Sequence, residues 1–288
     1  MKLLQPARLC AQCRPVIAFK RRTLIAALLA ALLLPGSHAV HAFQPLFNGR
    51  DLSGWDTWLG IETVPRLPLR LFGDWEGMLG LNTPNEVFSV VLEDGEPAIR
   101  VSGEIWGALI SHASYSRYHL RLQFKWGAAR HAPRRDKPPN TGLLYHSVGD
   151  YGAFWSYWMR SAEFEIMQGS TGNLTSVDGV TATVPGRWDF SVPIPWLRYA
   201  AQASGRSIGG LLFRVQALDD FEKPVGQWND LELMVDGTRA THLVNGRVVM
   251  TLSDLRTPDG AQLAAGRLQL QSEGAEVFFR RIALQEMP

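Results

Sequence analysis

Cysteine is nearly absent from this sequence. Its 288 residues include two cysteines, Cys10 and Cys13, and both precede the region that we expect to fold. The rest of the chain therefore has no disulfide framework, no thiolate nucleophile and no cysteine metal site. The phosphate-loop and H-E-x-x-H motifs are also missing, which argues against a nucleotide-binding enzyme and a zinc protease of the usual kinds.

Long apolar runs are confined to the N-terminus. Three basic residues at 20–22 precede an apolar run over 24–34, and Val40 and Ala42 fit the positions before a signal-peptidase cut. This pattern predicts a secretory signal over 1–42 and export to the periplasm or beyond. The run is shorter than the roughly 20 residues of a membrane span. An uncleaved anchor is the alternative, and the export route, general or twin-arginine, stays open.

An excess of basic residues is absent once this segment is set aside. Residues 1–42 carry six basic side chains and no acidic one, so the remaining 246 residues have 23 basic against 27 acidic side chains, a net charge of −4. This balance does not favour nucleic acid as a partner. We find no internal repeat or linker, and we predict one domain over 43–288 with a large core.

Helical periodicity is missing from 43–288, and strand patterns take its place. Apolar Leu120, Leu122 and Phe124 alternate strictly with polar residues over 118–126. Turn signals separate similar segments, and the Asn245-Gly246 pair predicts a two-residue hairpin turn. Many short antiparallel strands predict an all-β fold, a β-sandwich or jelly roll. The further strand segments are 230–235, 240–250, 266–271 and 276–284, and the proline-rich 131–140 is expected to be a loop.

The segment SAEFEIMQG, 161–169, carries two acids beside an apolar residue. In a strand, Glu163 and Glu165 point to one face while Phe164 and Ile166 point to the other. We expect the apolar pair to pack in the core and the acids to line a groove. A simply solvated face is the alternative.

Two more polar residues can serve chemistry beside these acids. His146, in NTGLLYHSVG (140–149), would lie beside Glu163 if the two strands pair, and could exchange protons there near neutral pH. Lys125 ends the polar face of its strand and could polarise a substrate oxygen. The alternatives are a structural histidine and a solvated lysine. We expect Lys125, His146 and Glu163 to converge in one sugar-sized hollow.

Aromatic residues gather in DYGAFWSYWM, 150–159. Trp155 and Trp158 are candidates for the flat platform on which sugar rings stack. A hydrophobic loop folded over the sheet edge explains the same composition.

Seven motifs, in one order along 43–288, resemble the 3-keto-disaccharide hydrolase domain family. They are FQPLFNGRDLSGW, YHLRLQFKWG, NTGLLYHSVG, SAEFEIMQGSTGN, QWNDLELMVDG, THLVNGRVV and LQLQSEGAEVFFRRIAL. The resemblance implies a concanavalin-A-like β-sandwich, exported in bacteria, with a carbohydrate pocket on its concave sheet.

The resemblance also implies site residues. Lys125, His146 and Glu163 match positions of the pocket, and Glu273, His242 and Asn245 match recurrent positions. We take as candidate catalytic residues His146, Glu163, Lys125, Glu165 and Glu273, and as candidate substrate-binding residues Tyr145, Trp155, Trp158, His242, Asn245 and Gln271.

Two departures from the family pattern affect this assignment. Glu165 stands where a glutamine is expected, and the MQGS stretch from Met167 to Ser170 stands where an acidic QEGD is expected. The loop after the strand therefore lacks two usual polar groups, which bears on the substrate and on any ligand or metal that the loop would hold.

The resemblance implies cleavage of 3-keto-glycosides. A base removes the hydrogen on carbon-2, the aglycone leaves carbon-1, and water adds to the unsaturated ketone. We expect His146 or Glu163 as base, Lys125 or a divalent metal ion at the enolate, and Glu165 or Glu273 as acid.

A non-catalytic carbohydrate-binding sandwich and a conventional glycosidase or lyase are the alternatives. The expected partner is a small sugar or oligosaccharide; no other cofactor and no membrane span after signal cleavage are expected.

Overall fold

Nineteen β-strands, and no helix, form the part of the chain that the structure describes. This computed structural model describes residues 42–61, 78–193, 195–210 and 212–288. The predicted signal, 1–42, lies outside the described residues except for Ala42. Within the described ranges, no helix has the length and apolar character needed to cross a membrane.

One group of strands centres on β7 (Arg117–Arg130), and we call it the β7 sheet. Its hydrogen-bonded order is β4–β5–β19–β7–β15–β16–β17, and the short β1 (Gln44–Pro45) also pairs with β19. The pairs in this sheet are antiparallel. The other strands of this sheet are β4 (Phe88–Glu93), β5 (Glu96–Val101), β15 (Asn229–Asp236), β16 (Arg239–Val244), β17 (Arg247–Arg256) and β19 (Ala275–Glu286).

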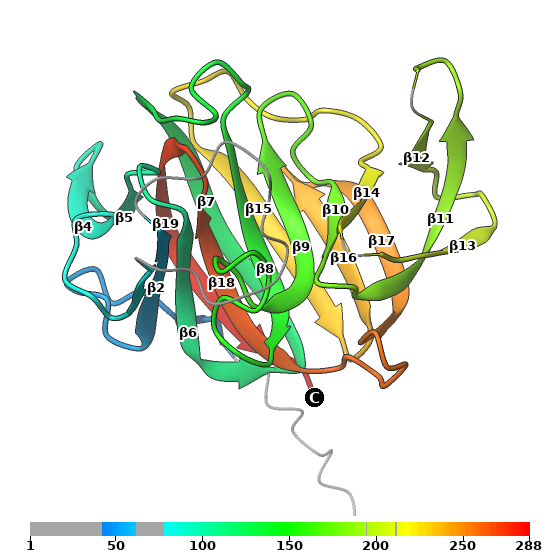
Figure 1. Cartoon of the computed structure of the whole chain (residues 1–288), viewed down its shortest axis with the longest axis horizontal. Helices are drawn as coiled ribbons and strands as arrows, with labels where there is room; N and C mark the ends of the chain where they lie inside the picture. Colours follow the sequence, from blue (N-terminus) through cyan, green and yellow to red (C-terminus); the bar gives the residue numbers. More distant parts are fainter. Residues whose placement is uncertain (1–41, 62–77, 194, 211) are drawn as a thin grey trace, which may run out of the picture. The chain divides into compact units, whose positions relative to one another are not determined.

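A second group, the β9 sheet, centres on β9 (Arg160–Met167) and carries the acids (Figure 1). Its order is β3–β2–β6–β18–β8–β9–β10–β14–β12–β11, antiparallel except for the β12–β14 pair. Strand β11 also pairs with β13 and β17, which joins the two sheets. Its other strands are β2 (Trp55–Ile61), β3 (Met78–Leu81), β6 (Gly107–Tyr115), β8 (Asn140–Val148), β10 (Leu174–Val177), β11 (Thr181–Asp189), β12 (Trp196–Tyr199), β14 (Leu212–Gln216) and β18 (Gly266–Ser272); β13 is Gly205–Ile208.

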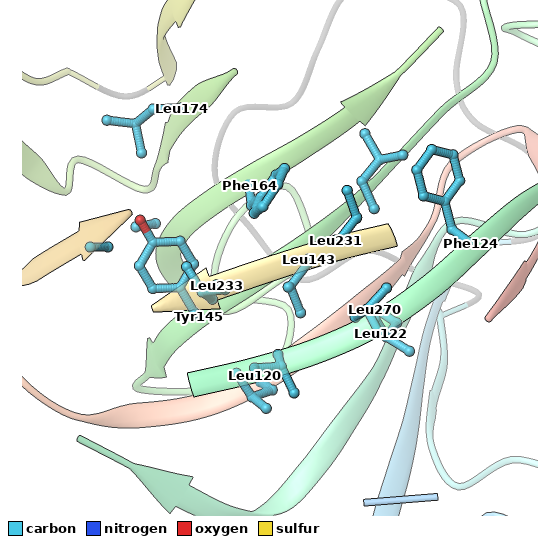
Figure 2. Packing of buried hydrophobic residues seen from close by; sticks show 14 of the residues in the cluster. Leu120, Leu122, Phe124, Leu143, Tyr145, Phe164, Leu174, Leu231, Leu233 and Leu270 are labelled. Carbon is cyan, nitrogen blue, oxygen red and sulfur yellow. The ribbon is translucent and has the colours of Figure 1, made fainter. Parts of the chain in front are cut away.

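The main core lies between these sheets. Leu120, Leu122 and Phe124 of β7 belong to the same buried cluster as Leu143 of β8 and Phe164 of β9, as Figure 2 shows. Burial of alternate residues from both sheets is the mark of a β-sandwich, and it supplies most of the stabilising apolar area. The predicted all-β sandwich is confirmed.

Local expectations from the strand patterns are also confirmed. The segment 118–126 lies within β7, and the predicted loop 131–140 connects β7 to β8 except for its last residue, Asn140, which begins β8. The Asn245-Gly246 turn joins β16 to β17, with both residues at positive φ and Val244 paired with Arg247. The two-residue turn matches the twist of the strands that it connects.

Candidate active site

Glu163 and Glu165 point away from the core, from the outer face of the β9 sheet. Phe164 and Ile166, between and beyond them, are fully buried in the main core. The acids are nevertheless almost inaccessible, with 4% of Glu163 and 1% of Glu165 exposed. The prediction of two acids on one face is confirmed, and the alternative of a solvated face is wrong.

Glu165 is held by two partners, Arg214 from β14, two strands away, and Asn173, directly before β10. Arg214 of β14 forms an ion pair with Oε1, and the Asn173 side-chain amide donates a hydrogen bond of 2.7 Å to Oε2. Burial raises the pKa of Glu165, whereas Arg214 opposes this by favouring the ionised carboxylate.

Glu273, after the end of β18, has a similar pair of partners. The amide of Asn140 donates a hydrogen bond of 2.9 Å to Oε2, and Nη1 of Arg134 lies 3.4 Å from Oε1. Burial raises the pKa of this carboxyl group, and the Arg134 guanidinium lowers it. Arg134 comes from the proline-rich loop 131–140.

Glu163 lies between these two pairs, and no described residue donates a hydrogen bond to its carboxyl group. The Gly142 backbone passes beneath it, so closely that a Cβ atom there would overlap Oε1 of Glu163 and lie 2.5 Å from Oε1 of Gln271. Around this cluster, three buried oxygens have no partner among the described residues: Oε1 of Gln271, Oγ1 of Thr175 and Oδ1 of Asn140. Buried polar atoms are normally hydrogen-bonded, so these oxygens mark a place prepared for a ligand.

The charges of this cluster do not balance. Three carboxyl groups, Glu163, Glu165 and Glu273, share two guanidinium groups. Burial raises the pKa of Glu163 well above its usual value, and the charges of Glu165 and Glu273 add to the effect. Since the arginines favour ionised Glu165 and Glu273, Glu163 is the carboxyl group of the three that holds a proton most readily. A carboxyl group tuned in this way is suited to proton transfer near neutral pH.

A pocket of about 270 Å³ adjoins the cluster, and Asn173 and Arg214, the partners of Glu165, are among its lining residues. Register places these groups in order across the sheet: Glu163 pairs with Thr175, Thr175 pairs with Arg214, and β12 continues the same row to Trp196. Met167 and Ser170, the ends of the MQGS stretch, also line this pocket. We call it the Arg214 pocket.

Lys125 lies on the other side of the sandwich. Its neighbours Phe124 and Trp126 belong to the main core, so Lys125 points outward from the β7 sheet. There its ammonium group forms ion pairs with Glu93 and Asp94, the latter at 2.7 Å. The prediction that Lys125 and Glu163 converge is therefore wrong. Alternation along a strand shows that a side chain faces away from the core, but it does not show which of the two sheets the strand belongs to.

His146 is turned into the core by a β-bulge. Tyr145 pairs with Ala162 and Val148 with Arg160, so β8 has one residue more than β9 between these pairs. His146 occupies the bulge at φ 52°. Its ring is fully buried, and Nε2 lies 2.8 Å from the carbonyl oxygen of Gly237.

This placement contradicts the predicted contact between His146 and Glu163. Leu144 is the residue opposite Glu163, and the extra residue reverses the alternation beyond it. Burial also lowers the pKa of His146, so the ring is neutral.

Tyr145 and His242 lie in the core behind the acids rather than beside a substrate. The Tyr145 hydroxyl is 3.0 Å from Nε2 of His242, and Nδ1 is 3.2 Å from the carbonyl oxygen of Gly172. The His242 ring stacks on Phe164 at 4.2 Å, and burial lowers its pKa to about 3. The prediction that Tyr145 and His242 contact the substrate directly is therefore wrong. Both side chains lie in the core and pack behind β9.

The remaining candidates are divided. Gln271 lies within the carboxyl cluster, whereas Asn245 is a turn residue whose amide bonds the carbonyl of Phe221 at 2.8 Å. Trp158 is buried and donates a hydrogen bond of 3.0 Å to the carbonyl of Gly107. Trp155 stacks on Phe154 at 4.3 Å. The segment 150–159 thus forms an apolar cover on the outer face of the β9 sheet beside Leu144.

Among the described residues, no three histidine, cysteine or acidic side chains are placed to hold a metal ion. Arginine and asparagine partners engage Glu165 and Glu273, so the three glutamates do not present a shared set of free oxygens. This arrangement does not fit a divalent metal ion, so we route no step through one.

Sequence reasoning missed Arg134, Arg214, Asn140 and Asn173. Arg214 lies in a short strand without a clear pattern, and Arg134 lies in a loop, so periodicity gives no indication of their direction. The one usable signal is charge: three acids buried on one face require cations nearby.

Comparison with known proteins decides the family. The model of the 3-keto-alpha-glucoside-1,2-lyase-like domain matches residues 42–285. The chain belongs to this family. It is therefore a carbohydrate-active β-sandwich protein. No curated protein matches the sequence significantly.

Solved structures show likeness at low identity. A protein of Parabacteroides distasonis ATCC 8503, provisionally described as a glycosyl hydrolase, is 15% identical, with 85% of this chain and 94% of that chain covered and a TM-score of 0.48. The carbohydrate-binding module CBM66 of Bacillus subtilis is 10% identical (69% and 92% covered, TM-score 0.39). Alginate lyase A1-II′, as a double-cysteine variant, is 9% identical (82% and 96% covered, TM-score 0.42). At these TM-scores the likenesses carry no functional argument.

Proposed function

We propose that this protein is an exported enzyme that cleaves 3-keto-glucosides by elimination followed by hydration. The observation that carries the proposal is the carboxyl group of Glu163, buried without a hydrogen-bond donor among the described residues and flanked by two guanidinium groups, in a chain of the 3-keto-alpha-glucoside-1,2-lyase-like family.

The ketone on carbon-3 acidifies the hydrogen on carbon-2. Glu163 acts in its ionised form, which forms as the pH rises towards its raised pKa; it removes this proton, and the electron pair of the carbon–hydrogen bond moves into an enolate on the carbon-3 oxygen. A raised pKa makes Glu163 a stronger base than an ordinary carboxylate. Arg134 and Arg214 are both close enough to lower the pKa of Glu163, and their charge stabilises the enolate.

Collapse of the enolate then breaks the bond between carbon-1 and the glycosidic oxygen. Glu163 returns its proton to the departing oxygen, and the aglycone leaves as an alcohol. Water adds its hydroxyl to carbon-1 of the unsaturated ketone and its proton to carbon-2. One water is consumed, and 3-keto-glucose and the free aglycone are produced. Gln271, Thr175 and Asn140 contribute unpaired oxygens that accept hydrogen bonds from sugar hydroxyls.

Isotope labelling separates this reaction from ordinary hydrolysis. The purified protein is incubated in heavy water with a 3-keto-α-glucoside and, in parallel, with the unoxidised glucoside. We expect release of aglycone from the keto substrate alone. Deuterium at carbon-2 of the product should be well above the level at carbon-4, which serves as the reference because its hydrogen exchanges without the enzyme. Glu163→Gln should abolish release.

Four other outcomes contradict the proposal. Turnover that leaves the carbon-2 hydrogen in place, or cleavage of the unoxidised glucoside, indicates a conventional glycosidase. Saturable sugar binding with no turnover indicates a carbohydrate-binding protein. Unchanged activity of Glu163→Gln removes Glu163 from the mechanism.

A further inference from the structure

The Arg214 pocket lies on the same face as Glu163, along one cross-strand row. From Glu163 the row runs through Thr175 and Arg214 to Trp196, which is three strand steps. At about 4.8 Å per step, Trp196 lies about 14 Å from Glu163 along the sheet. The pocket is therefore one place that the leaving group of a sugar lying over Glu163 and Gln271 can reach along the sheet.

The charged and amide groups that line the pocket are mostly engaged within the protein. Asn173 donates to Glu165 and accepts a hydrogen bond of 2.8 Å from the backbone of Ala217. Arg214 is paired with Glu165, and Arg198 lies 3.5 Å from Asp189. The Ser170 hydroxyl also accepts a hydrogen bond of 3.4 Å from Asn173. A leaving group rich in hydroxyls would find few unengaged partners here, with Gln216 the main exception.

The apolar lining, in contrast, is open to a ligand. Met167, Val192 and Trp196 line the pocket, and 39% of Trp196 is exposed. A tryptophan face exposed in a pocket beside a methionine is suited to stacking against a flat ring. Strand β12 sets its direction, since Leu197 and Tyr199 pack in the main core and Trp196 and Arg198 face the pocket.

We infer that the Arg214 pocket binds an aromatic leaving group, so that the enzyme acts on 3-keto-glucosides of phenols and other aromatic alcohols. This inference rests on the proposed function for its reaction and on the pocket for its specificity. Trp196 stacks on the aromatic ring, Met167 and Val192 enclose its edge, and Gln216 meets a polar substituent on the ring.

Two substrates with the same reacting sugar test this specificity. The specificity constants kcat/KM are measured for 4-nitrophenyl 3-keto-α-glucoside and for a 3-keto-disaccharide. Trp196→Ala should lower the value for the aryl substrate about tenfold, as expected for loss of a stacked ring, and change the value for the disaccharide less than twofold. Trp196→Phe should restore most of the aryl activity.

Trp188→Ala is the matched control. Trp188 lies in the adjacent strand β11 and is 41% exposed, but it pairs with Leu197 and contacts Phe213, on the opposite face from Trp196. We expect both substrates to be turned over at the wild-type rate by this variant. An equal loss on both substrates in Trp196→Ala, or a larger loss on the disaccharide, overturns the aromatic assignment.

A binding measurement separates failure of this inference from failure of the proposed function. Calorimetry compares unoxidised 4-nitrophenyl α-glucoside with methyl α-glucoside, neither of which requires turnover. Wild type should prefer the aryl compound, and Trp196→Ala should lose about tenfold of that preference. If this result holds without any turnover of keto substrates, the reaction is wrong and the pocket assignment stands. No preference in wild type overturns the pocket assignment itself.

Discussion

Gly142 lies directly beneath the carboxyl group of Glu163. A Cβ atom at Gly142 would overlap Oε1 of Glu163 and press on Oε1 of Gln271, whereas the backbone itself is not in a left-handed conformation. Alanine is therefore compatible with the strand and incompatible with the present position of the two side chains. The absence of a side chain at Gly142 thus leaves the space that the carboxyl group of Glu163, the proposed base, occupies.

Replacing Gly142 by alanine should impair catalysis far more than folding. Because the atoms that must move are the ends of side chains, we expect the midpoint of thermal unfolding to change by only a few degrees. Displacing the base by about 1 Å should lower kcat/KM for a 3-keto-glucoside about a hundredfold. Kinetics and thermal unfolding of the same sample give both values.

Gly127→Ala is the control for this substitution. Its Cβ atom would meet the flexible side chain of Glu276, from Cγ to the carboxyl group, but in the β7 sheet. This variant should keep wild-type kcat/KM. Equal activity of Gly142→Ala and wild type would show that Glu163 does not act from its present position.

Alternation along single strands made much of the fold predictable. The strict two-residue period over 118–126 and the order of acids and apolar residues at 163–166 correctly predict which side chains enter the core. The hairpin at Asn245-Gly246 is predictable because its two residues tolerate positive φ. Each of these signals depends on neighbouring residues of one segment, and in these segments tertiary context leaves it intact.

The candidate site was only partly predictable, because its geometry depends on pairings between strands. The bulge in β8 turns His146 into the core, and nothing in NTGLLYHSVG indicates an extra residue there. Lys125 faces outward as its pattern predicts, but from the other sheet. Arg214 reaches Glu165 across two strand pairings that no local pattern specifies.

Glu163→Gln should change how stability depends on pH. Burial raises the pKa of Glu163 in the folded state, so the folded protein keeps a proton that the unfolded chain releases near pH 4.5. Unfolding releases this proton at pH values between the two pKa values. The contribution of Glu163 to the free energy of unfolding therefore falls as pH rises through that window. Glutamine removes this contribution.

Urea unfolding at pH 5, 6, 7 and 8 tests this expectation. The free energy of Glu163→Gln relative to wild type should rise with pH, by up to about 1.4 kcal/mol per pH unit. The exposed Glu86, changed to Gln, serves as control and should give a curve parallel to that of wild type. A parallel curve for Glu163→Gln would show that Glu163 is ionised in the folded protein.

Lys125→Met should leave catalysis intact, because Lys125 lies on the outer face of the other sheet. Removing the ammonium group leaves Glu93 and Asp94 without their partner, and we expect a loss of about 1 kcal/mol in the free energy of unfolding. We expect kcat/KM within twofold of wild type. A tenfold loss of activity in a folded Lys125→Met variant would place Lys125 in the mechanism and contradict the site described above.

Arg214→Met should destabilise the protein because it leaves Glu165 buried with only Asn173 as a polar partner. Because Arg214 itself is partly exposed, we expect a loss of about 2–3 kcal/mol at pH 8, towards the lower end of values for broken buried pairs. The double variant Arg214→Met/Glu165→Gln removes both charges and should recover at least half of this loss. Urea unfolding of the four proteins in the cycle measures the coupling. Both Arg214 variants should have low kcat/KM, because the enolate loses a guanidinium group. Additive losses of stability would instead show that the two side chains do not interact in solution.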